Sequence, residues 1–360
     1  MEQFFCKTKI ISGPGSLAAL AELHIQRLLI VTDPFFFKNG TANHIAHISK
    51  AEKVEVFHKV APDPGVTLAA EGTQLVQTFQ PDTVLALGGG SAMDCAKAMV
   101  YFSNLDTRFI AVPTTSGSGS EVTNFAILTH NGIKHPLVDE KLRPHIAILD
   151  SELLTSMPKK LIADTGFDLI SHALEAWAAT GTNPITDALA LDALRAAFTH
   201  LPKSYAGDPS ARLPVHTAAT MAGMAFSSAG LGLCHAISHA LGGEFHTPHG
   251  RLNAILLPAV LDINAETALH RYAALSRRLG FSSGVDPIAL RALKNKLLQL
   301  RREMDLPDTL SAAGIPTYAL RDKMESIITA ALADPCCATN PVKPEALHIR
   351  KILHEVMGRG

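Results

Sequence analysis

Short apolar runs rich in β-branched residues alternate with helical stretches through the first 150 residues. Five runs have the length and composition of buried strands, at residues 27–32, 54–57, 83–87, 109–112 and 145–149. Segments with helical periodicity lie between the first four, at 35–48, 66–79 and 91–103. Such alternation is typical of βαβ units, in which helices cover both faces of a parallel sheet. The pattern predicts an α/β domain over residues 1–151, with one added antiparallel hairpin that turns at Asn131-Gly132.

The chain changes character after about Ser151. Long helical segments follow one another at 167–179, 185–200, 217–241, 266–279 and 287–303, with few β-branched runs among them. Pro184 and Pro287 stand where the first turn of a helix accepts proline. The sequence therefore predicts a second, all-helical domain over residues 152–360.

The composition is that of an ordinary soluble globular protein. Of the 360 residues, 47% are hydrophobic and 18% are charged, which suits two domains with full cores. A net charge of -1 provides no basic surface for nucleic acid or for an anionic membrane, so neither is an expected partner. Charged residues near the start, in MEQFFCKTK, interrupt the apolar core that a signal peptide needs, and a cytoplasmic location is expected.

One uncharged stretch, residues 221–243, has the length of a membrane span. Its glycines, serines and histidines favour instead a helix that is buried in protein. The five cysteines form no C-x-x-C pair, which argues against a disulfide framework and against a thiolate zinc site.

A glycine turn joins the predicted strand 83–87 to the helix that follows it. In Gly88-Gly89-Gly90-Ser91, backbone N–H groups and the helix N-terminus can meet a phosphate without obstruction by side chains. The turn does not match G-x-G-x-x-G, and a tight turn without a ligand is the alternative. A second loop, PTTSGSGSE at 113–121, follows the next strand and should lie at the same sheet edge, where open α/β folds bind ligands. Two such loops together favour a dinucleotide site.

Asp33 ends the predicted strand 27–32. A carboxylate in this position can accept a hydrogen bond from a ribose 2′-hydroxyl and repel a 2′-phosphate, which favours NAD over NADP. The alternative is that Asp33 caps the helix that starts at Pro34.

Four histidines lie within fifteen residues in the helical half of the chain. His235 and His239 are spaced i, i+4 and therefore share one face of a helix. His246 and His249 follow the Gly242-Gly243 pair, at which that helix should end, and can fold back toward it.

Asp168 and His172 repeat the i, i+4 spacing on a second predicted helix. Each has an ordinary alternative, because Thr165 and Asp168 fit a capping box and a lone buried histidine is usually a hydrogen-bonded core residue. Two such pairs on apolar helices would leave several imidazoles unsatisfied unless a cation or a substrate lies between them. Two helices and one loop could thus place one carboxylate and three imidazoles around a divalent cation, with Fe(II), Zn, Mn, Co and Ni all open.

Taken together, the motifs resemble those of the iron-containing (group III) alcohol dehydrogenases, closest to the 1-propanol dehydrogenases of propanediol and ethanolamine utilisation. They run nearly from end to end: Gly13-x-Gly15, GGGSAMDxAK at 88–97, PTTSGSGSE at 113–121, GFDLISHALEA at 166–176, GLGLCHAISHALG at 230–242, TPHG at 247–250 and Thr339-Asn340-Pro341. The resemblance implies a Rossmann-like dinucleotide-binding domain followed by an all-helical metal-binding domain, an architecture shared with dehydroquinate synthase.

The resemblance also assigns residues, position by position. The metal ligands would be Asp168, His172, His235 and His249, with Fe2+ as the metal and Zn2+ as the alternative. His239, beside the metal, would assist proton transfer. Contacts to NAD(H) would come from Asp33, Gly89, Gly90, Ser91, Thr114, Thr115, Ser118 and Lys134. The substrate pocket would include Phe125, Phe226 and Cys336.

The sequence departs from the family pattern at three positions. Asp63 stands where Asn is usual, which puts one cofactor contact in doubt. Val342 stands where Arg is common, and His246 occupies a position that is Asn in some members, so the role of His246 stays open.

The implied reaction is reversible hydride transfer between NAD(H) and a short primary alcohol, with reduction of an aldehyde such as propanal as the expected cellular direction. A phosphorylated-polyol dehydrogenase or a dehydroquinate synthase-like lyase would need cationic residues for its substrate. The expected ligands are flanked instead by Phe226, Leu231, Leu233 and Phe245, with Arg251 as the basic residue nearby. A noncatalytic metal-binding scaffold is the second rival, and the complete ligand set argues against it. The resemblance further implies a homodimer, with a bacterial microcompartment as an alternative to the open cytoplasm.

Overall fold

The computed structural model describes residues 4–130 and 133–358 and divides the chain into two compact units. The first unit runs from Cys6 to Met157, and the second comprises the chain from Pro158 onward together with the described residues that precede Cys6.

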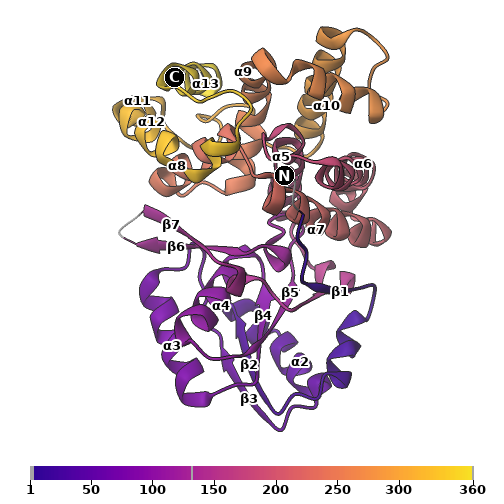
Figure 1. The fold of residues 1–360 in the computed structure, drawn as a ribbon, viewed down its shortest axis with the longest axis vertical. Helices are drawn as coiled ribbons and strands as arrows, with labels where there is room; N and C mark the ends of the chain where they lie inside the picture. Colours follow the sequence, from indigo (N-terminus) through magenta and orange to yellow (C-terminus); the bar gives the residue numbers. More distant parts are fainter. Residues whose placement is uncertain (1–3, 131–132, 359–360) are drawn as a thin grey trace. The chain divides into compact units, whose positions relative to one another are not determined.

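A six-stranded parallel sheet forms the centre of the first unit (Figure 1). Its strand order is β1-β8-β5-β4-β2-β3. The strands are β1 (Lys9–Ser12), β2 (Arg27–Thr32), β3 (Lys53–Phe57), β4 (Thr83–Gly88), β5 (Arg108–Pro113) and β8 (Ile146–Leu149). The predicted parallel α/β fold is confirmed. Strand β1 lacks a sequence signal because most of its residues are exposed at the edge of the sheet.

Alternate residues of the strands pack against two different helical layers. In β2, Leu29 and Val31 belong to a core with α3 (Val66–Phe79) and α4 (Gly90–Ser103). Leu28 and Ile30 belong to a core on the opposite face, with the 3-10 helix η1 (Ser16–Glu22) and α2 (Thr41–Ser49). Figure 1 shows α3 and α4 on one side of the sheet and α2 on the other. Burial on both faces explains why these strands are continuous apolar runs.

Two details of the first unit differ from expectation. The helix predicted over 35–48 is divided into α1 (Pro34–Lys38) and α2, because Gly40 adopts a left-handed φ of 85° between them. The hairpin consists of β6 (Phe125–His130) and β7 (Ile133–Val138), which pair in antiparallel fashion as a separate two-stranded sheet and do not extend the main one. The turn predicted at Asn131-Gly132 lies outside the described residues.

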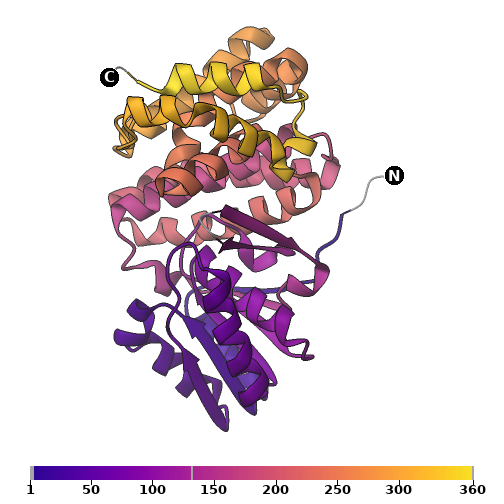
Figure 2. The same ribbon diagram turned by 90° about the vertical axis from the view of Figure 1, so that its left-hand side faces the viewer.

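Within the described residues, the second unit is helical throughout, as Figure 2 shows. Its central helix is α5, which packs against α6, α7 and α9 and is buried along most of its length. The helices are α5 (Lys159–Ala178), α6 (Pro184–Ala206), α7 (Arg212–Ala229), α8 (Leu233–Phe245), α9 (His249–Arg278), α10 (Asp286–Glu303), α11 (Thr317–Asp322), α12 (Met324–Ala333) and α13 (Ala346–Val356). The predicted all-helical architecture is confirmed.

The prediction of a single helix over residues 217–241 is wrong. The chain leaves α7 at Gly230 and enters α8 after Gly232, and the axes of the two segments differ by 105°. Helix α8 then continues through Gly242 and Gly243 to Phe245, so these two glycines are not its end. The membrane-length stretch is therefore two short helices set at an angle. Helix α9 is long and apolar enough to span a membrane, but 72% of its apolar window is buried inside the protein.

Candidate active site

Helix α5 carries three acidic and imidazole side chains along one face. Asp168, His172 and Glu175 are spaced i, i+4 and i+7, and all three are buried. The helix begins at Lys159, so Asp168 lies in its interior, and the hydroxyl of Thr165 donates to the Leu161 carbonyl at 2.8 Å. The capping-box explanation of Asp168 is therefore wrong.

Three imidazoles from three helices approach the carboxylate of Asp168. Nε2 of His172, of His235 and of His249 lie 3.9, 3.9 and 3.5 Å from Asp168 Oδ1. The rings of His172 and His235 stack at 4.5 Å, and the ring of His249 lies 5.1 Å from that of His235. The four residues expected to bind the metal are thus brought together. His249 comes from the first turn of α9 and not from a loop.

A close approach of α9 to α5 places His249 in this group. A Cβ atom on Gly250 would lie 1.8 Å from the carbonyl oxygen of Asp164 and 3.1 Å from the Cβ of Asp168. A glycine at position 250 therefore allows the first turn of α9 to lie directly against α5. The next residue, Arg251, forms two hydrogen bonds with the Asp164 carboxylate, at 3.1 and 2.8 Å.

His235 has the environment of a metal ligand. Its Nδ1 lies 2.6 Å from Glu175 Oε2, and its Nε2 is buried without a hydrogen-bond partner anywhere in residues 4–130 and 133–358. Burial, followed by the positive charge of neighbouring histidines, lowers the pKa of His235 well below its usual value. A neutral imidazole with one buried, unpaired nitrogen is what a divalent cation requires. The residues present therefore fit the metal that the sequence predicts.

His239 lies next to this group and bonds to a different carboxylate. Its ring stacks on that of His249 at 5.1 Å, and its Nδ1 lies 2.8 Å from Asp334 Oδ2. Burial would raise the pKa of Asp334, but the hydrogen bond and charge of His239, together with bonds from Cys336, lower it to about 2. Asp334 is thus an ionised acceptor that orients the His239 ring.

Two of the three predicted substrate-pocket residues lie at this centre. Phe226, on α7, stacks on the ring of His172 at 4.4 Å. Cys336 belongs to the short helix η6 (Pro335–Thr339) and groups with His239 and Asp334. Burial, and then the charge of Asp334, raise the pKa of the Cys336 thiol well above its usual value, so this thiol stays protonated. Phe125, the third, belongs to the first unit and starts β6.

The predicted cofactor loops meet at the carboxyl ends of β2, β4 and β5, which are neighbours in the sheet. The amide of Thr114 donates to the Gly88 carbonyl at 3.0 Å and so joins the two loops. Asp33 Oδ1 caps α1 by accepting from the amides of Phe35 and Phe36, at 2.8 and 3.1 Å. Its other oxygen lies 3.9 Å from the place where a Cβ on Gly88 would stand. Asp33 therefore both caps a helix and borders the glycine turn.

The other expected cofactor residues divide into two groups. The first group surrounds the start of α4 and comprises Gly89, Gly90, Ser91, Thr115 and Ser118. The two loops are close here, because a Cβ atom on Gly89 would lie 3.1 Å from Thr115 Oγ1. The second is Lys134 on β7, whose Nζ forms a 2.8 Å ion pair with Asp63 Oδ1. The aspartate that replaces the usual asparagine at position 63 therefore pairs with an expected cofactor residue.

Sequence reasoning missed the buried Lys97, which lies next to the loop at residues 113–121. Nζ of Lys97 donates to Ser120 Oγ, to Thr123 Oγ1 and to the carbonyls of Thr123 and Phe125, at 2.8–3.1 Å. Burial lowers the pKa of Lys97 and raises that of Asp94, and each charge opposes the shift of the other. The i, i+3 spacing of Asp94 and Lys97 on an otherwise apolar helix is the sequence signal that could have found them.

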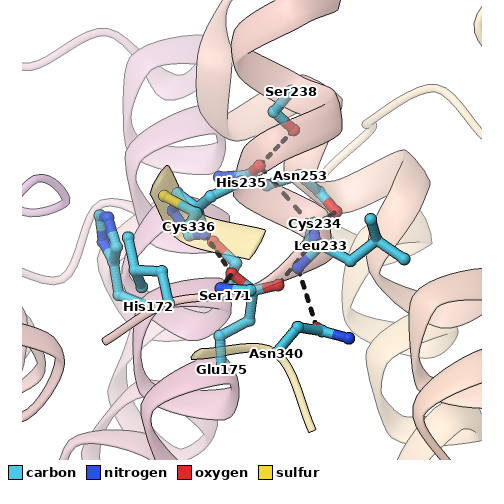
Figure 3. A network of polar contacts seen from close by, with 12 residues as sticks. Ser171, His172, Glu175, Leu233, Cys234, His235, Ser238, Asn253, Cys336 and Asn340 are labelled. Atoms are coloured by element: carbon cyan, nitrogen blue, oxygen red, sulfur yellow. Dashed lines mark hydrogen bonds and ion pairs between the residues drawn. The ribbon is translucent and has the colours of Figure 1, made fainter. Parts of the chain in front are cut away.

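Sequence reasoning also assigned no role to Glu175 or Asp334, which hold His235 and His239 (Figure 3 shows Glu175). Glu175 lies seven residues after Asp168, and this spacing could have placed it on the same helix face. Asp334 is almost a hundred residues from His239 along the chain, and no local pattern links them.

A parallel sheet with two glycine-containing loops at one edge, and a helical unit that gathers one carboxylate and three imidazoles, are together typical of a metal-dependent dinucleotide oxidoreductase. Comparison with protein families narrows this class. The model of the iron-containing alcohol dehydrogenases matches residues 7–151, and the model of the C-terminal part of the Fe-containing alcohol dehydrogenase family matches residues 162–357. The chain belongs to the iron-containing alcohol dehydrogenase family.

Similar proteins of known name match nearly the whole chain. The 1-propanol dehydrogenase PduQ of Salmonella typhimurium is 40% identical, over 99% of this chain and 100% of its own length. The NADPH-dependent butanol dehydrogenase of Clostridium saccharobutylicum is 36% identical, over 98% and 97%. The structure of sulfoacetaldehyde reductase from Bifidobacterium kashiwanohense in complex with NAD+ is 26% identical, with a TM-score of 0.90 over 99% of this chain and 98% of that one. By family, then, the protein is an iron-type alcohol dehydrogenase, and the grouped carboxylate and imidazole side chains of Asp168, His172 and His235 could hold a metal ion.

Proposed function

We propose that this enzyme reduces short, uncharged aldehydes such as propanal to primary alcohols with NADH, and catalyses the reverse oxidation. The observation that carries the proposal is the convergence of three Nε2 atoms on the Asp168 carboxylate, with the ring of Phe226 stacked on His172. In this proposal Asp168, His172, His235 and His249 hold Fe2+, with Zn2+ as the alternative. The helical domain, residues 152–360, supplies the metal and substrate site, and residues 1–151 supply the dinucleotide site.

The bound metal would act as a Lewis acid on the substrate oxygen while the nicotinamide ring exchanges hydride with the substrate carbon. The side chains of this chain perform the remaining tasks. Phe226 and the protonated thiol of Cys336 line the pocket and exclude water. His239, held by ionised Asp334, exchanges the proton that the alcohol gains or loses.

The charges near the site support an uncharged substrate. A phosphorylated polyol would need a basic side chain that is available to it. Arg251, the basic residue in the first turn of α9, is instead paired with Asp164 through two hydrogen bonds. This pairing neutralises Arg251 and favours a small alcohol over a phosphorylated one. A homodimer, in the cytoplasm or in a microcompartment, is part of the proposal.

The proposal is tested by metal analysis and kinetics on the same preparation. Protein purified without oxygen should contain about one divalent metal per chain and should oxidise NADH with C2 to C4 aldehydes. Removal of the metal by a chelator should reduce kcat by about 10³-fold, since a metal supplies several kcal/mol of transition-state stabilisation. Fe2+ or Zn2+ should restore kcat. Unchanged turnover in the metal-free protein, or turnover with glycerol 1-phosphate but not propanal, would contradict the proposal.

Replacement of Asp334 by asparagine tests the proton relay. The amide oxygen can still accept from the Cys336 amide, a bond that measures 2.8 Å, so η6 should stay capped. The charge that holds His239 Nδ1 is lost, and we expect kcat to fall about 10- to 100-fold. The KM for NADH should change by less than about twofold, because Asp334 belongs to the substrate side of the reaction. A native kcat in steady-state assays would show that the charge of Asp334 has no part in the proton relay.

A further inference from the structure

The N-terminus of α8 is capped by side chains from distant parts of the chain (Figure 3). Gly232, in the N-cap position, has no side chain with which to accept the first amide hydrogens. Glu175 of α5 accepts from the amides of Gly232 and Cys234, at 3.0 and 2.7 Å. Asn340 accepts from the amide between them, that of Leu233, at 3.0 Å. Two side chains thus replace a local cap.

The same Glu175 carboxylate also holds the imidazole of His235. Oε2 lies 2.6 Å from Nδ1 of His235, and the Glu175 side chain is only 3% exposed. The carboxylate already accepts from two backbone amides, which favours its ionised form, and an ionised carboxylate can only accept from the imidazole, so the proton of this contact would lie on Nδ1. Nε2, the buried nitrogen 3.9 Å from Asp168 Oδ1, is then left with its lone pair. The carboxylate therefore selects the tautomer that a metal requires.

The packing leaves no space for an ordinary cap on α8. A Cβ on Gly232 would lie 2.6 Å from Asn340 Oδ1 and 3.0 Å from Glu175 Oε1. Any larger N-cap residue would displace Glu175 from the helix end, and with it the partner of His235. The positions of the α8 N-terminus, the Glu175 carboxylate and the His235 imidazole therefore depend on one another.

We propose that Glu175 is a positioning residue for the metal, which fixes both the helix that carries His235 and the tautomer and direction of the His235 ring. The inference rests on the proposed ligand set and adds a residue that is not itself a ligand. Carboxylates that hold a metal-binding histidine in this way change metal affinity about 10- to 100-fold when they are replaced. A residue that only capped α8 would change stability and not the affinity of the folded site.

The test compares Glu175→Gln with Asn340→Ala, a matched variant at the same helix end. The glutamine keeps the size and one acceptor, but its NH2 group facing Nδ1 would move the imidazole proton to Nε2. The alanine removes the cap on Leu233 together with the hydrogen bonds of Asn340 to Asn264 and Val342, and none of these bonds involves a histidine. Metal-free forms of both variants and of the native chain are titrated with Co2+ against a competing chelator, with visible absorption and thermal unfolding recorded.

Both variants should unfold at a lower temperature than the native protein. We expect the Kd for Co2+ to rise about 10- to 100-fold in Glu175→Gln, with altered Co2+ absorption bands, and to stay within about twofold in Asn340→Ala. If Glu175→Gln does not fold, Glu175→Asp keeps the charge but withdraws it from Nδ1 and should show a comparable loss. The inference would be overturned if the folded variant at position 175, Glu175→Gln or Glu175→Asp, had the native affinity for Co2+ and the native absorption spectrum. An equal loss of Co2+ affinity in Asn340→Ala would also overturn it.

A third variant, His235→Ala, separates the inference from the proposed function. If it binds Co2+ as tightly as the native chain, the ligand set itself is wrong. If it loses Co2+ while Glu175→Gln retains native affinity, the ligand set stands and only the role of Glu175 is wrong.

Discussion

His235→Ala should lose tight metal binding and with it almost all aldehyde reduction. The variant removes the nitrogen that is buried without a hydrogen-bond partner in the described parts of the chain, and it leaves Asp168 with one imidazole fewer. Loss of about 4 kcal/mol of transition-state stabilisation corresponds to a decrease of about 10³-fold in kcat/KM. The measurements are metal content by elemental analysis and NADH oxidation with propanal.

His246→Asn is the matched control for this variant. His246 is exposed and ends α8 in a left-handed conformation with a φ of 52°, which asparagine tolerates. It is not one of the residues that approach Asp168, so metal content and kcat/KM should stay within about twofold of native. Retention of stoichiometric metal and of NADH oxidation by His235→Ala would show that the histidine cluster is not the reaction centre.

Asp33→Asn should weaken the discrimination between NADH and NADPH. Asparagine keeps the acceptor that caps α1 but removes the negative charge beside the glycine turn. A like charge next to a 2′-phosphate costs several kcal/mol. We expect the substitution to relieve up to half of this repulsion. The value of kcat/KM for NADPH, divided by the value for NADH, should then rise about 10- to 100-fold. Initial rates with each cofactor at saturating propanal give the ratio.

Asp139→Asn provides the comparison within the same unit. Asp139 also caps a helix, the 3-10 helix η3 (Glu140–Leu142), by accepting from the Lys141 amide. Asp139 is not one of the expected cofactor residues, so the same change of charge there should leave the cofactor ratio unaltered. An equal change of ratio in both variants would mean that net charge, and not the position of Asp33, sets the preference.

The elements that local pattern predicted well are those that carry a continuous apolar run or a helix cap of their own. Strands β2, β4 and β5 are buried on both faces and were recognisable as short apolar runs. The start of α6 carries its own signal, because Asn183 caps it and Pro184 occupies its first turn. Such signals lie within a few residues of the element that they define.

The errors lie where a local signal competes with tertiary packing. Gly242 and Gly243 indicate the end of a helix, yet α8 continues through both, and the chain breaks instead at Gly230 and Gly232. The break is stabilised by Glu175 and Asn340, from segments 57 and 107 residues away. Their contribution is absent from any short window of sequence.

For this protein, the sequence alone was sufficient to establish a parallel α/β half, a helical half and the residue types of a metal site, because periodicity and i, i+4 spacing follow from backbone geometry. Only the tertiary structure could show that Asp334 holds His239 and that Glu175 contacts His235. These contacts join residues that are distant in the chain, and they form only when buried helices pack closely enough for each polar group to find its partner.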